Sequence, residues 1–353
     1  MTVIATMKEA AISLSERTGV MERVRRSAWR RQRLLILCYH GVSIDDEHLW
    51  NSRLYVSPQF LRRRLDLLKR GGYEVLLLDE GLRRLRDGTL PQSAVCLTFD
   101  DGAYDFYARA FPVLQEFGYP ATVYQTTYYA DYNRPVFDTF ASYLLWKSGR
   151  GEVSLGSIVP GAGVRDLRNA DARNETLRTL LEHASTMALS GEAKDVLLVR
   201  LADLLRVDLA PLLRRRILQI MNPFEIQELS KRGIDFQLHT HRHRSPKEQE
   251  AFAVEIGDNR RWLEDVTGHV ARHFCYPSGV YRRDMMEWLS EQGIESAATC
   301  DPGMATSDIS PLLLPRFIDT QGISDNVFRA WASGVAELLP RRTRFAHPDD
   351  RDV

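Results

Sequence analysis

Two adjacent carboxylates, Asp100 and Asp101, follow an apolar run at residues 94–99 and precede Gly102. If that run is a strand of a parallel sheet, both acids lie at its carboxyl end, where the active sites of α/β folds open. Two neighbouring acids at such a place are costly unless a cation or a proton balances them. Adjacent side chains point in different directions, so one can bind a metal while the other reaches a water. Taken alone, the pair also fits a helix N-cap with an acidic first turn.

Three of the nine histidines, His239, His241 and His243, fall within five residues directly after the apolar run 234–238. Neutral imidazole is the commonest protein ligand of zinc-like cations. His239 and His243 are four residues apart and can converge on one ion if the loop turns, whereas we expect His241 to point elsewhere. A polar surface loop in which the histidines are incidental is the alternative for this cluster alone.

The two clusters together offer a ligand set of two histidines and one carboxylate, His239, His243 and Asp101. Such a set leaves coordination positions open for water and substrate, as a catalytic metal requires. Asp100 is then available as the general base for the attacking water. Zinc fits these ligands, which also accept cobalt, nickel, manganese or iron.

The elements that must position these groups alternate between strand and helix. The helix Pro58–Arg70 is marked by a proline at its start and two glycines after its end, and Asn222, Pro223 and Glu225 mark another helix start. Alternation of this kind predicts a mainly parallel sheet or barrel. Residues 135–220 interrupt it with helical runs, which we interpret as a helical insertion, a lid or substrate wall. The expected strands are 34–39, 73–78, 94–99, 121–127, 234–239, 274–276, 295–299 and 312–318.

The segments TFDDG at 98–102 and HTxxH at 239–243, in this order, resemble the polysaccharide deacetylase family with the NodB homology domain. Members fold as an irregular (β/α) barrel and hydrolyse N- or O-acetyl groups on carbohydrates. The resemblance covers about residues 34–320, interrupted by the insertion. It implies that Asp100 is the general base and that Asp101 and the two motif histidines bind the metal.

The segment FCYPSG at 274–279 resembles the proline-containing wall segment of that family, but it is altered. The family has an arginine two residues before the proline and an aromatic residue after it, where this chain has Cys275 and Ser278. The absent arginine normally orients the catalytic base. Arg316 is the favoured substitute and Arg272 the second, and a surface ion pair is the alternative for each.

The same resemblance places Tyr276 and Pro277 at the substrate and makes the backbone N–H of Ser278 a candidate oxyanion donor. Residues 38–42, CYHGV, resemble the YHxV segment of the subgroup that acts on poly-N-acetylglucosamine. In that subgroup the acid histidine lies on the N-terminal side, and the family's C-terminal Leu-His motif is not evident here. His40 is therefore the candidate proton donor, with a structural histidine as the alternative.

The charge pattern limits the partners. Lys and Arg number 47, as do Asp and Glu, so no net charge favours nucleic acid. Six arginines within residues 23–33 predict either a solvated helix face or peripheral contact with anionic lipid. Four widely spaced cysteines are typical of buried thiols rather than of a disulfide framework. The first thirty residues lack a secretory signal, so we expect a cytoplasmic location, with the inner membrane face as a second choice.

We therefore expect an N-terminal helix in residues 1–33, a deacetylase-like barrel in 34–320, and a C-terminal helix with a charged tail in 321–353. The expected function is metal-dependent removal of N-acetyl groups from an amino sugar, lipid-linked glycan or polysaccharide, in exopolysaccharide or cell-envelope glycan metabolism. The alternatives are a deformylase or O-acetyl esterase on a related sugar, and a non-catalytic carbohydrate-binding relative, which the altered third motif favours.

Overall fold

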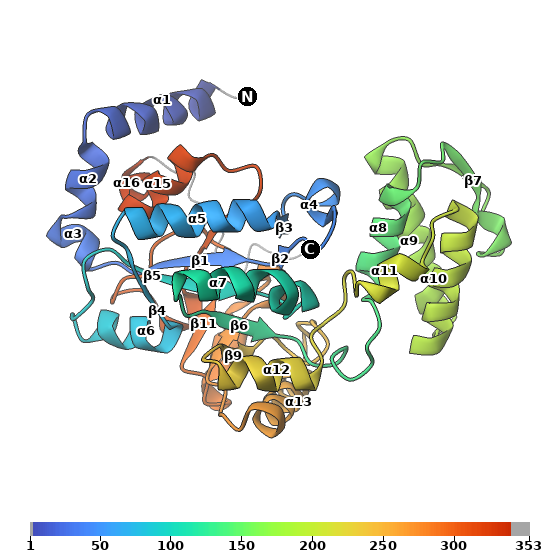
Figure 1. The fold of residues 1–353 in the computed structure, drawn as a ribbon. Coiled ribbons are helices and arrows are strands. Elements are labelled where there is room, and N and C mark those ends of the chain that lie inside the picture. Colours follow the sequence, from blue (N-terminus) through green and yellow to red (C-terminus); the bar gives the residue numbers. More distant parts are fainter. Residues whose placement is uncertain (1–2, 340–353) are drawn as a thin grey trace.

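The computed structural model describes residues 3–339, and one parallel sheet lies at the centre of this part of the chain (Figure 1). Its eight strands are β1 (Leu35–Tyr39), β4 (Glu74–Leu76), β5 (Ala94–Phe99), β6 (Thr122–Gln125), β9 (Asp235–Leu238), β10 (His273–Cys275), β11 (Ser296–Ala298) and β12 (Phe317–Ile318). They follow the order β11-β10-β9-β6-β5-β1-β12, with β4 beside β5. Every pairing in this sheet is parallel. Each strand lies at or near a predicted position.

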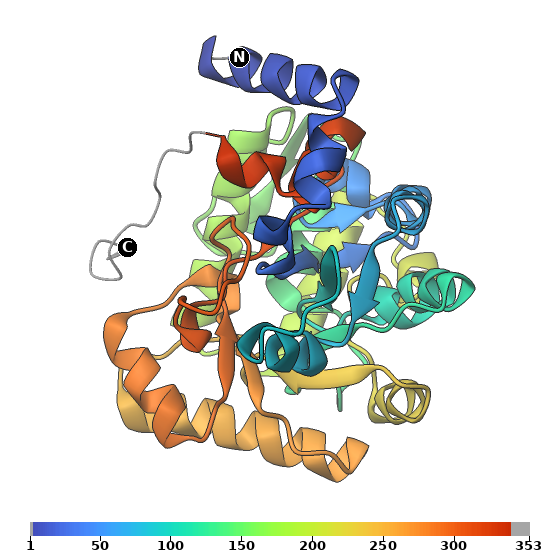
Figure 2. The ribbon, with the colours of Figure 1, turned by 90° about the vertical axis from the view of Figure 1, so that its left-hand side faces the viewer.

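The sheet curls until its two edge strands come close. Leu314, just before β12, donates its N–H to the carbonyl of Ala297 in β11 at 2.8 Å, and the N–H of Thr299 donates to the Leu314 carbonyl at 2.9 Å. Strand β12 then pairs with β1 through Phe317 and Leu37. The result is a curled half-barrel with helices around its outside (Figure 2), which confirms the predicted irregular (β/α) barrel.

Strand β1 shows how the sequence decides which side chains face the barrel interior. All five of its residues are buried, as in a parallel strand that is covered on both faces. Because alternate residues point to opposite faces, Ile36 joins the cluster inside the barrel with Tyr124, whereas Leu35 and Leu37 pack in the larger core beneath the helices. Cys38 therefore points inward.

The outer helices begin and end near the predicted residues. Helix α5 has the predicted bounds, Pro58–Arg70, and α12 (Pro223–Lys231) begins with the predicted capping box. After β5 the chain forms a π-helical turn, η1 (Phe106–Ala110), followed by α7 (Phe111–Phe117), in which Pro112 lacks the N–H that a regular turn would use. The other helices around the sheet are α6 (Leu78–Arg86), α13 (Gln249–Thr267), α14 (Arg283–Glu291) and α15 (Asp325–Ser333).

The N-terminal segment forms three helices rather than the one expected: α1 (Val3–Arg17), α2 (Val20–Arg25) and α3 (Ala28–Arg31). Gly19, with φ of 70°, separates the first two. The C-terminal helix is likewise divided, because Gly334, with φ of 93°, separates α15 from α16 (Val335–Leu338). The charged tail that was expected after it lies outside the described residues.

The arginine-rich segment is partly structural. Arg30 is buried, and its guanidinium donates to the carbonyls of Arg33, Ala94 and Ala332. Arg30 is thus unavailable for the lipid contact considered above. The arginines of this segment that remain exposed are Arg23, Arg26 and Arg31. No helix among residues 3–339 is long and apolar enough to cross a membrane.

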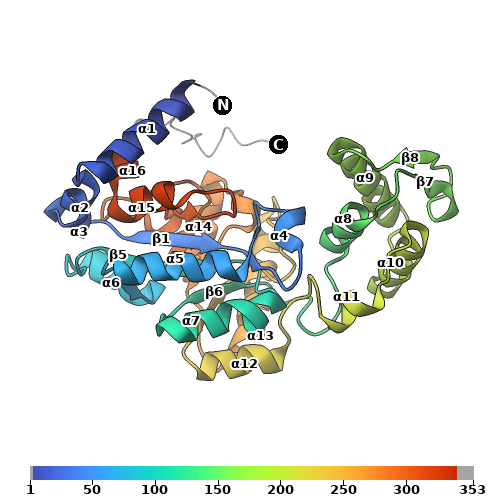
Figure 3. The same ribbon diagram turned by 45° about the horizontal axis from the view of Figure 1, so that its top comes forward.

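Residues 137–218 form a separate lobe beyond the carboxyl ends of the strands (Figure 3). Its helices surround a hydrophobic cluster of their own, and it also contains an antiparallel hairpin that was not predicted. The lobe contacts the barrel at α4 (Glu47–Trp50), where the Asp46 carboxylate accepts hydrogen bonds from Tyr143 and Lys147. Its elements are α8 (Phe137–Lys147), β7 (Glu152–Ser154), η2 (Leu155–Ser157), β8 (Val164–Asp166), α9 (Ala170–Thr186), α10 (Gly191–Leu205) and α11 (Ala210–Arg214).

Candidate active site

The Asp100 carboxylate is buried after the last residue of β5 and forms a bidentate ion pair with Arg316. Nη1 of Arg316 donates to Oδ1 at 2.7 Å and Nη2 donates to Oδ2 at 2.8 Å. Burial raises the pKa of Asp100, but the adjacent guanidinium outweighs it and holds the pKa well below its usual range. The carboxylate is therefore ionised. Arg272, the other predicted substitute, forms an exposed ion pair with Glu295 instead.

The three predicted metal ligands converge at the same end of the sheet. Oδ1 of Asp101 lies 3.2 Å from Nε2 of His239 and 3.3 Å from Nε2 of His243. Desolvation raises the pKa of Asp101, but its contacts with these histidines hold it well below its usual range. His241 points elsewhere, as predicted, with Nδ1 at 2.8 Å from the hydroxyl of Thr127.

The orientation of His239 suits a metal ligand. Its Nδ1 lies 2.8 Å from the carbonyl oxygen of Cys275, which can only accept, so Nδ1 donates and Nε2, which faces Asp101, is the nitrogen left to bind a cation. The donor atoms of Asp101, His239 and His243 all lie within 4.8 Å of one another. One carboxylate oxygen and two imidazole nitrogens at this spacing fit a divalent cation such as zinc.

Helix α13 holds the histidine loop in place through two polar residues on its inner face. Asn259 is fully buried; its Oδ1 accepts the N–H of His239 at 2.9 Å, and its Nδ2 donates to the hydroxyl of Thr127 at 3.0 Å. One turn earlier, the carboxylate of Glu255 accepts the N–H of Arg242 at 2.7 Å. Sequence reasoning missed both residues, although polar side chains four apart on the buried face of an amphipathic helix are a usable signal.

The backbone around the site departs from regular conformations. Asp101, Thr240, His243 and Ser278 all have φ between 56° and 71°, where residues other than glycine are uncommon. Such conformations cost free energy and persist only where the surrounding structure holds them, as it does at functional sites. Gly102 also has φ of +75°, and a Cβ atom there would lie 2.0 Å from the Gln125 side chain, so only glycine fits.

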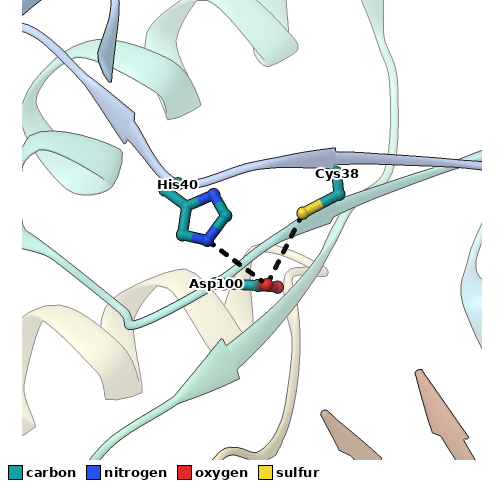
Figure 4. Close-up of side chains that lie close together, drawn as sticks. All are labelled: Cys38, His40 and Asp100. Atoms are coloured by element: carbon teal, nitrogen blue, oxygen red, sulfur yellow. Dashed lines mark hydrogen bonds and ion pairs between the residues drawn. The ribbon is translucent and has the colours of Figure 1, made fainter. Parts of the chain in front are cut away.

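His40 and two thiols surround the second oxygen of Asp100. Nε2 of His40 lies 3.8 Å from Oδ2, and both His40 and Cys38 point toward the carboxylate from β1 and the residue after it (Figure 4). The Sγ atoms of Cys38 and Cys275 each lie 3.5 Å from the same oxygen. Burial raises the pKa of both thiols well above the usual range, so they remain protonated and donate to the carboxylate. His40 is the group of this set that retains an exposed fraction, 18%.

The altered third motif is placed differently from what its resemblance implied. The hydroxyl of Tyr276 donates to the carbonyl of Leu312 at 3.1 Å in the core, and Pro277 is buried. The side chain of Tyr276 therefore faces the interior and not a substrate, because its ring packs against Phe274. Ser278 is exposed and in a left-handed conformation.

A comparison with known families decides the classification. The sequence profile described as polysaccharide deacetylase matches residues 87–156 and 212–297, which include Asp100, Asp101 and both candidate histidine ligands. These two segments carry the polysaccharide deacetylase domain. The interval between the two matched segments, 157–211, falls inside the lobe, so the profile leaves most of the lobe unmatched.

Two curated relatives match part of the chain. It is 33% identical over 127 residues to the poly-beta-1,6-N-acetyl-D-glucosamine N-deacetylases of Escherichia coli O157:H7 and Escherichia coli (strain K12). The match covers 34% of this chain and 19% of each relative. The chain thus spans about a fifth of the length of the curated deacetylases that it matches.

Solved structures share the fold. The Streptococcus pyogenes deacetylase PplD in complex with acetate superposes with a TM-score of 0.55 at 19% identity, over 87% of this chain and 99% of that one. IcaB from Ammonifex degensii gives 0.52 at 18% identity, over 85% and 97%. At these identities the likeness concerns the fold alone, and the site is defined by the geometry described above.

Proposed function

We propose that this chain is a metal-dependent deacetylase that removes N-acetyl groups from an amino-sugar glycan. The observation that carries the proposal is Asp100, an ionised and buried carboxylate beside the ligand set of Asp101, His239 and His243. A structural metal site does not need a further ionised acid next to its ligands. The names of the Escherichia coli relatives support N-acetylglucosamine polymers as the substrate class.

Asp101, His239 and His243 would hold a divalent cation, with zinc as the first candidate and cobalt, nickel, manganese or iron as the others. Such a cation supplies Lewis acidity toward an amide carbonyl and lowers the pKa of an attacking water. The protein contributes orientation, because the Cys275 carbonyl fixes the ring of His239 and Asn259 fixes its backbone. This support keeps the imidazole of His239 beside the Asp101 carboxylate.

The remaining groups divide the proton transfers between them. Asp100 accepts a proton from the attacking water. Arg316 fixes the orientation of this carboxylate by donating a hydrogen bond to each of its two oxygens. His40 donates a proton to the leaving amine, for which its partial exposure and its position beside Asp100 suit it. The N–H of Ser278 donates to the oxyanion that forms on the acetyl carbon. The products are acetate and a free amino sugar.

Arg316 also bears on the rival functions. A binding-only relative was favoured by the loss of the family arginine at Cys275, but a guanidinium from another strand end occupies the place beside Asp100. Because Asp100 thus has an arginine partner, the site supports catalytic turnover rather than binding alone. A formamide or an O-acetyl ester would be cleaved by the same groups, so the assay should compare these acyl groups on one sugar.

The test begins with the metal, which requires no assumption about the substrate. We expect elemental analysis of the purified protein to find about one zinc-like ion per chain, and the double variant His239→Ala/His243→Ala to lose it. His241→Ala is the matched control, because this histidine lies in the same loop but points to Thr127. The control should keep the ion, and wild-type protein should release acetate from N-acetylglucosamine oligomers.

Two results would contradict the proposal. Absence of bound metal after reconstitution at neutral pH would remove the hydrolytic mechanism and favour a binding role. Metal retained equally by the double variant and by the control would place the ion elsewhere in the molecule.

A further inference from the structure

A groove of about 420 Å³ lies between the loop after β6 and the turn that joins α9 to α10 of the lobe. This volume is within the range of about 300–1,000 Å³ that is usual for ligand pockets. Tyr128, Tyr129 and Tyr132 line the groove from the barrel side. The ring of Tyr128 lies 5.2 Å from each of the other two, so the three rings form a continuous aromatic wall.

The aromatic wall is joined directly to the loop of the candidate metal ligands. The N–H of Tyr128 donates to the carbonyl of His241 at 2.8 Å, and the two rings meet edge to face at 5.5 Å. His241 is separated from His239 and His243 by one residue on each side. One wall of the groove is therefore attached to the loop that carries two of the candidate metal ligands.

The charges in the groove balance one another. Arg134 and Lys194 face Glu192 and Asp195, two cations against two anions, and Arg134 Nη1 pairs with Asp195 Oδ2 at 3.1 Å. A polyanion would find no net positive charge here. Aromatic rings with a hydroxyl at one end, beside paired charges, instead suit a neutral ligand that has apolar faces and many hydroxyl groups. A chain of acetylated sugars has these properties.

We propose that this groove is a glycan-binding subsite for the sugar units next to the one that is deacetylated. The inference rests on the proposed function and deepens it, because it makes the substrate a chain of several neutral N-acetylated sugars rather than a free monosaccharide. The lobe then acts as one wall of the substrate path, with the tyrosine loop as the other. Tyr132, with 48% of its surface exposed, offers its ring to the bound chain.

The experiment measures turnover and binding separately, with a pentamer of N-acetylglucosamine as the probe. For Tyr132→Ala we expect KM to rise about tenfold, the effect of losing one well-packed aromatic contact, with kcat and metal content unchanged. Tyr132→Phe keeps the ring but loses the hydroxyl, so its KM should lie between those of the wild type and Tyr132→Ala. Phe224→Ala is the matched control, because Phe224 is a 70% exposed aromatic residue that does not line the groove.

Binding is measured by titration calorimetry of the pentamer against the same variants in an Asp100→Asn background, which prevents turnover. If the wild type releases acetate but Tyr132→Ala and Phe224→Ala share its KM, the subsite is wrong and the proposed function stands. If the wild type releases no acetate, the proposed function fails, and calorimetry decides the subsite: weaker binding of Tyr132→Ala alone supports it, and equal or absent binding overturns it.

Discussion

Two fully buried arginine–aspartate pairs lie on opposite sides of strand β1. Inside the barrel Arg316 pairs with Asp100, and beneath helix α5 Arg64 pairs with Asp319, with Nε at 2.8 Å from Oδ2. Neighbouring residues of β1 serve the two sides, because alternate side chains point in opposite directions. The thiol of Cys38 faces Asp100, and the hydroxyl of Tyr39 donates to Asp319 at 2.9 Å.

The pairs differ in the number of acids that share each guanidinium. Arg64 also binds Asp325 at 2.6 Å, whereas Arg316 has Asp100 as its carboxylate partner and protonated thiols around it. Burial raises the pKa of Asp319 to about 6 even though Arg64 lowers it, and Asp325 adds to the rise. The same kind of ion pair thus keeps Asp100 ionised inside the barrel, whereas Asp319 beneath helix α5 takes up a proton near pH 6.

The largest expected effect separates the two acids by activity. Asp100→Asn should lower kcat for acetate release by about 10²–10⁴-fold, the usual contribution of a general base, while metal content is retained. Asp319→Asn should leave kcat near that of the wild type at a temperature where both variants are folded. Near-normal turnover of Asp100→Asn would show that this carboxylate is not the base.

Removing either arginine should cost stability, but only one removal should also cost activity. Arg64→Met and Arg316→Met each leave a buried carboxylate without its main partner, which typically lowers the free energy of unfolding by about 3–5 kcal/mol. Urea unfolding measures this loss. Only Arg316→Met should reduce kcat, measured well below the unfolding transition. An equal fall of kcat in both variants would mean that the two pairs affect the site only through general stability.

The pH dependence of stability should show the raised pKa of Asp319. Because its folded pKa of about 6 lies above the ordinary 3.8, the folded chain retains a proton that the unfolded chain has released. This stabilising contribution is complete below about pH 4 and is lost as the pH rises through 6. Relative to the wild type, Asp319→Asn should therefore become more stable between these values, by about 2–3 kcal/mol. Parallel unfolding free energies of the two proteins across this range would contradict it.

The smallest expected effects concern single contacts around the Arg64–Asp319 pair. Tyr39→Phe removes the hydroxyl that donates to Asp319 and should lower the free energy of unfolding by about 1–2 kcal/mol. Arg63→Ala removes an ion pair with Asp325 whose arginine is 67% exposed, so its effect on the free energy of unfolding should be smaller than that of Tyr39→Phe. If the exposed pair proved the more important, burial would not be what distinguishes these contacts.

Local signals predicted most of the barrel. Apolar runs such as Ala94–Phe99 and the cap at Asn222 depend on residues close together in sequence, and both appear as expected. The site motifs could be found for the same reason, since Asp100 and Asp101 stand together at one strand end. The division of the N-terminal helices at Gly19 was missed, because a glycine alone does not show whether the chain turns there.

Long-range partners were harder to derive. The sequence left two arginines as substitutes for the missing family residue, and only the curling of the sheet brings Arg316 to a carboxylate 216 positions away. The inward direction of Cys38 and Cys275 and the support from Asn259 likewise depend on how strands and helices pack. Tyr276 was expected at the substrate, but its ring fills the core.

The chain enters and leaves the lobe at one paired crossing. The N–H of Val136 on the way in donates to the carbonyl of Leu218 on the way out at 3.2 Å, and Pro135 bridges Gln219. In terms of recombination, the gene segment that encodes residues 137–218 can be replaced at this crossing. The chain segments on either side of the lobe are already paired with each other there, so the barrel would keep its own connections.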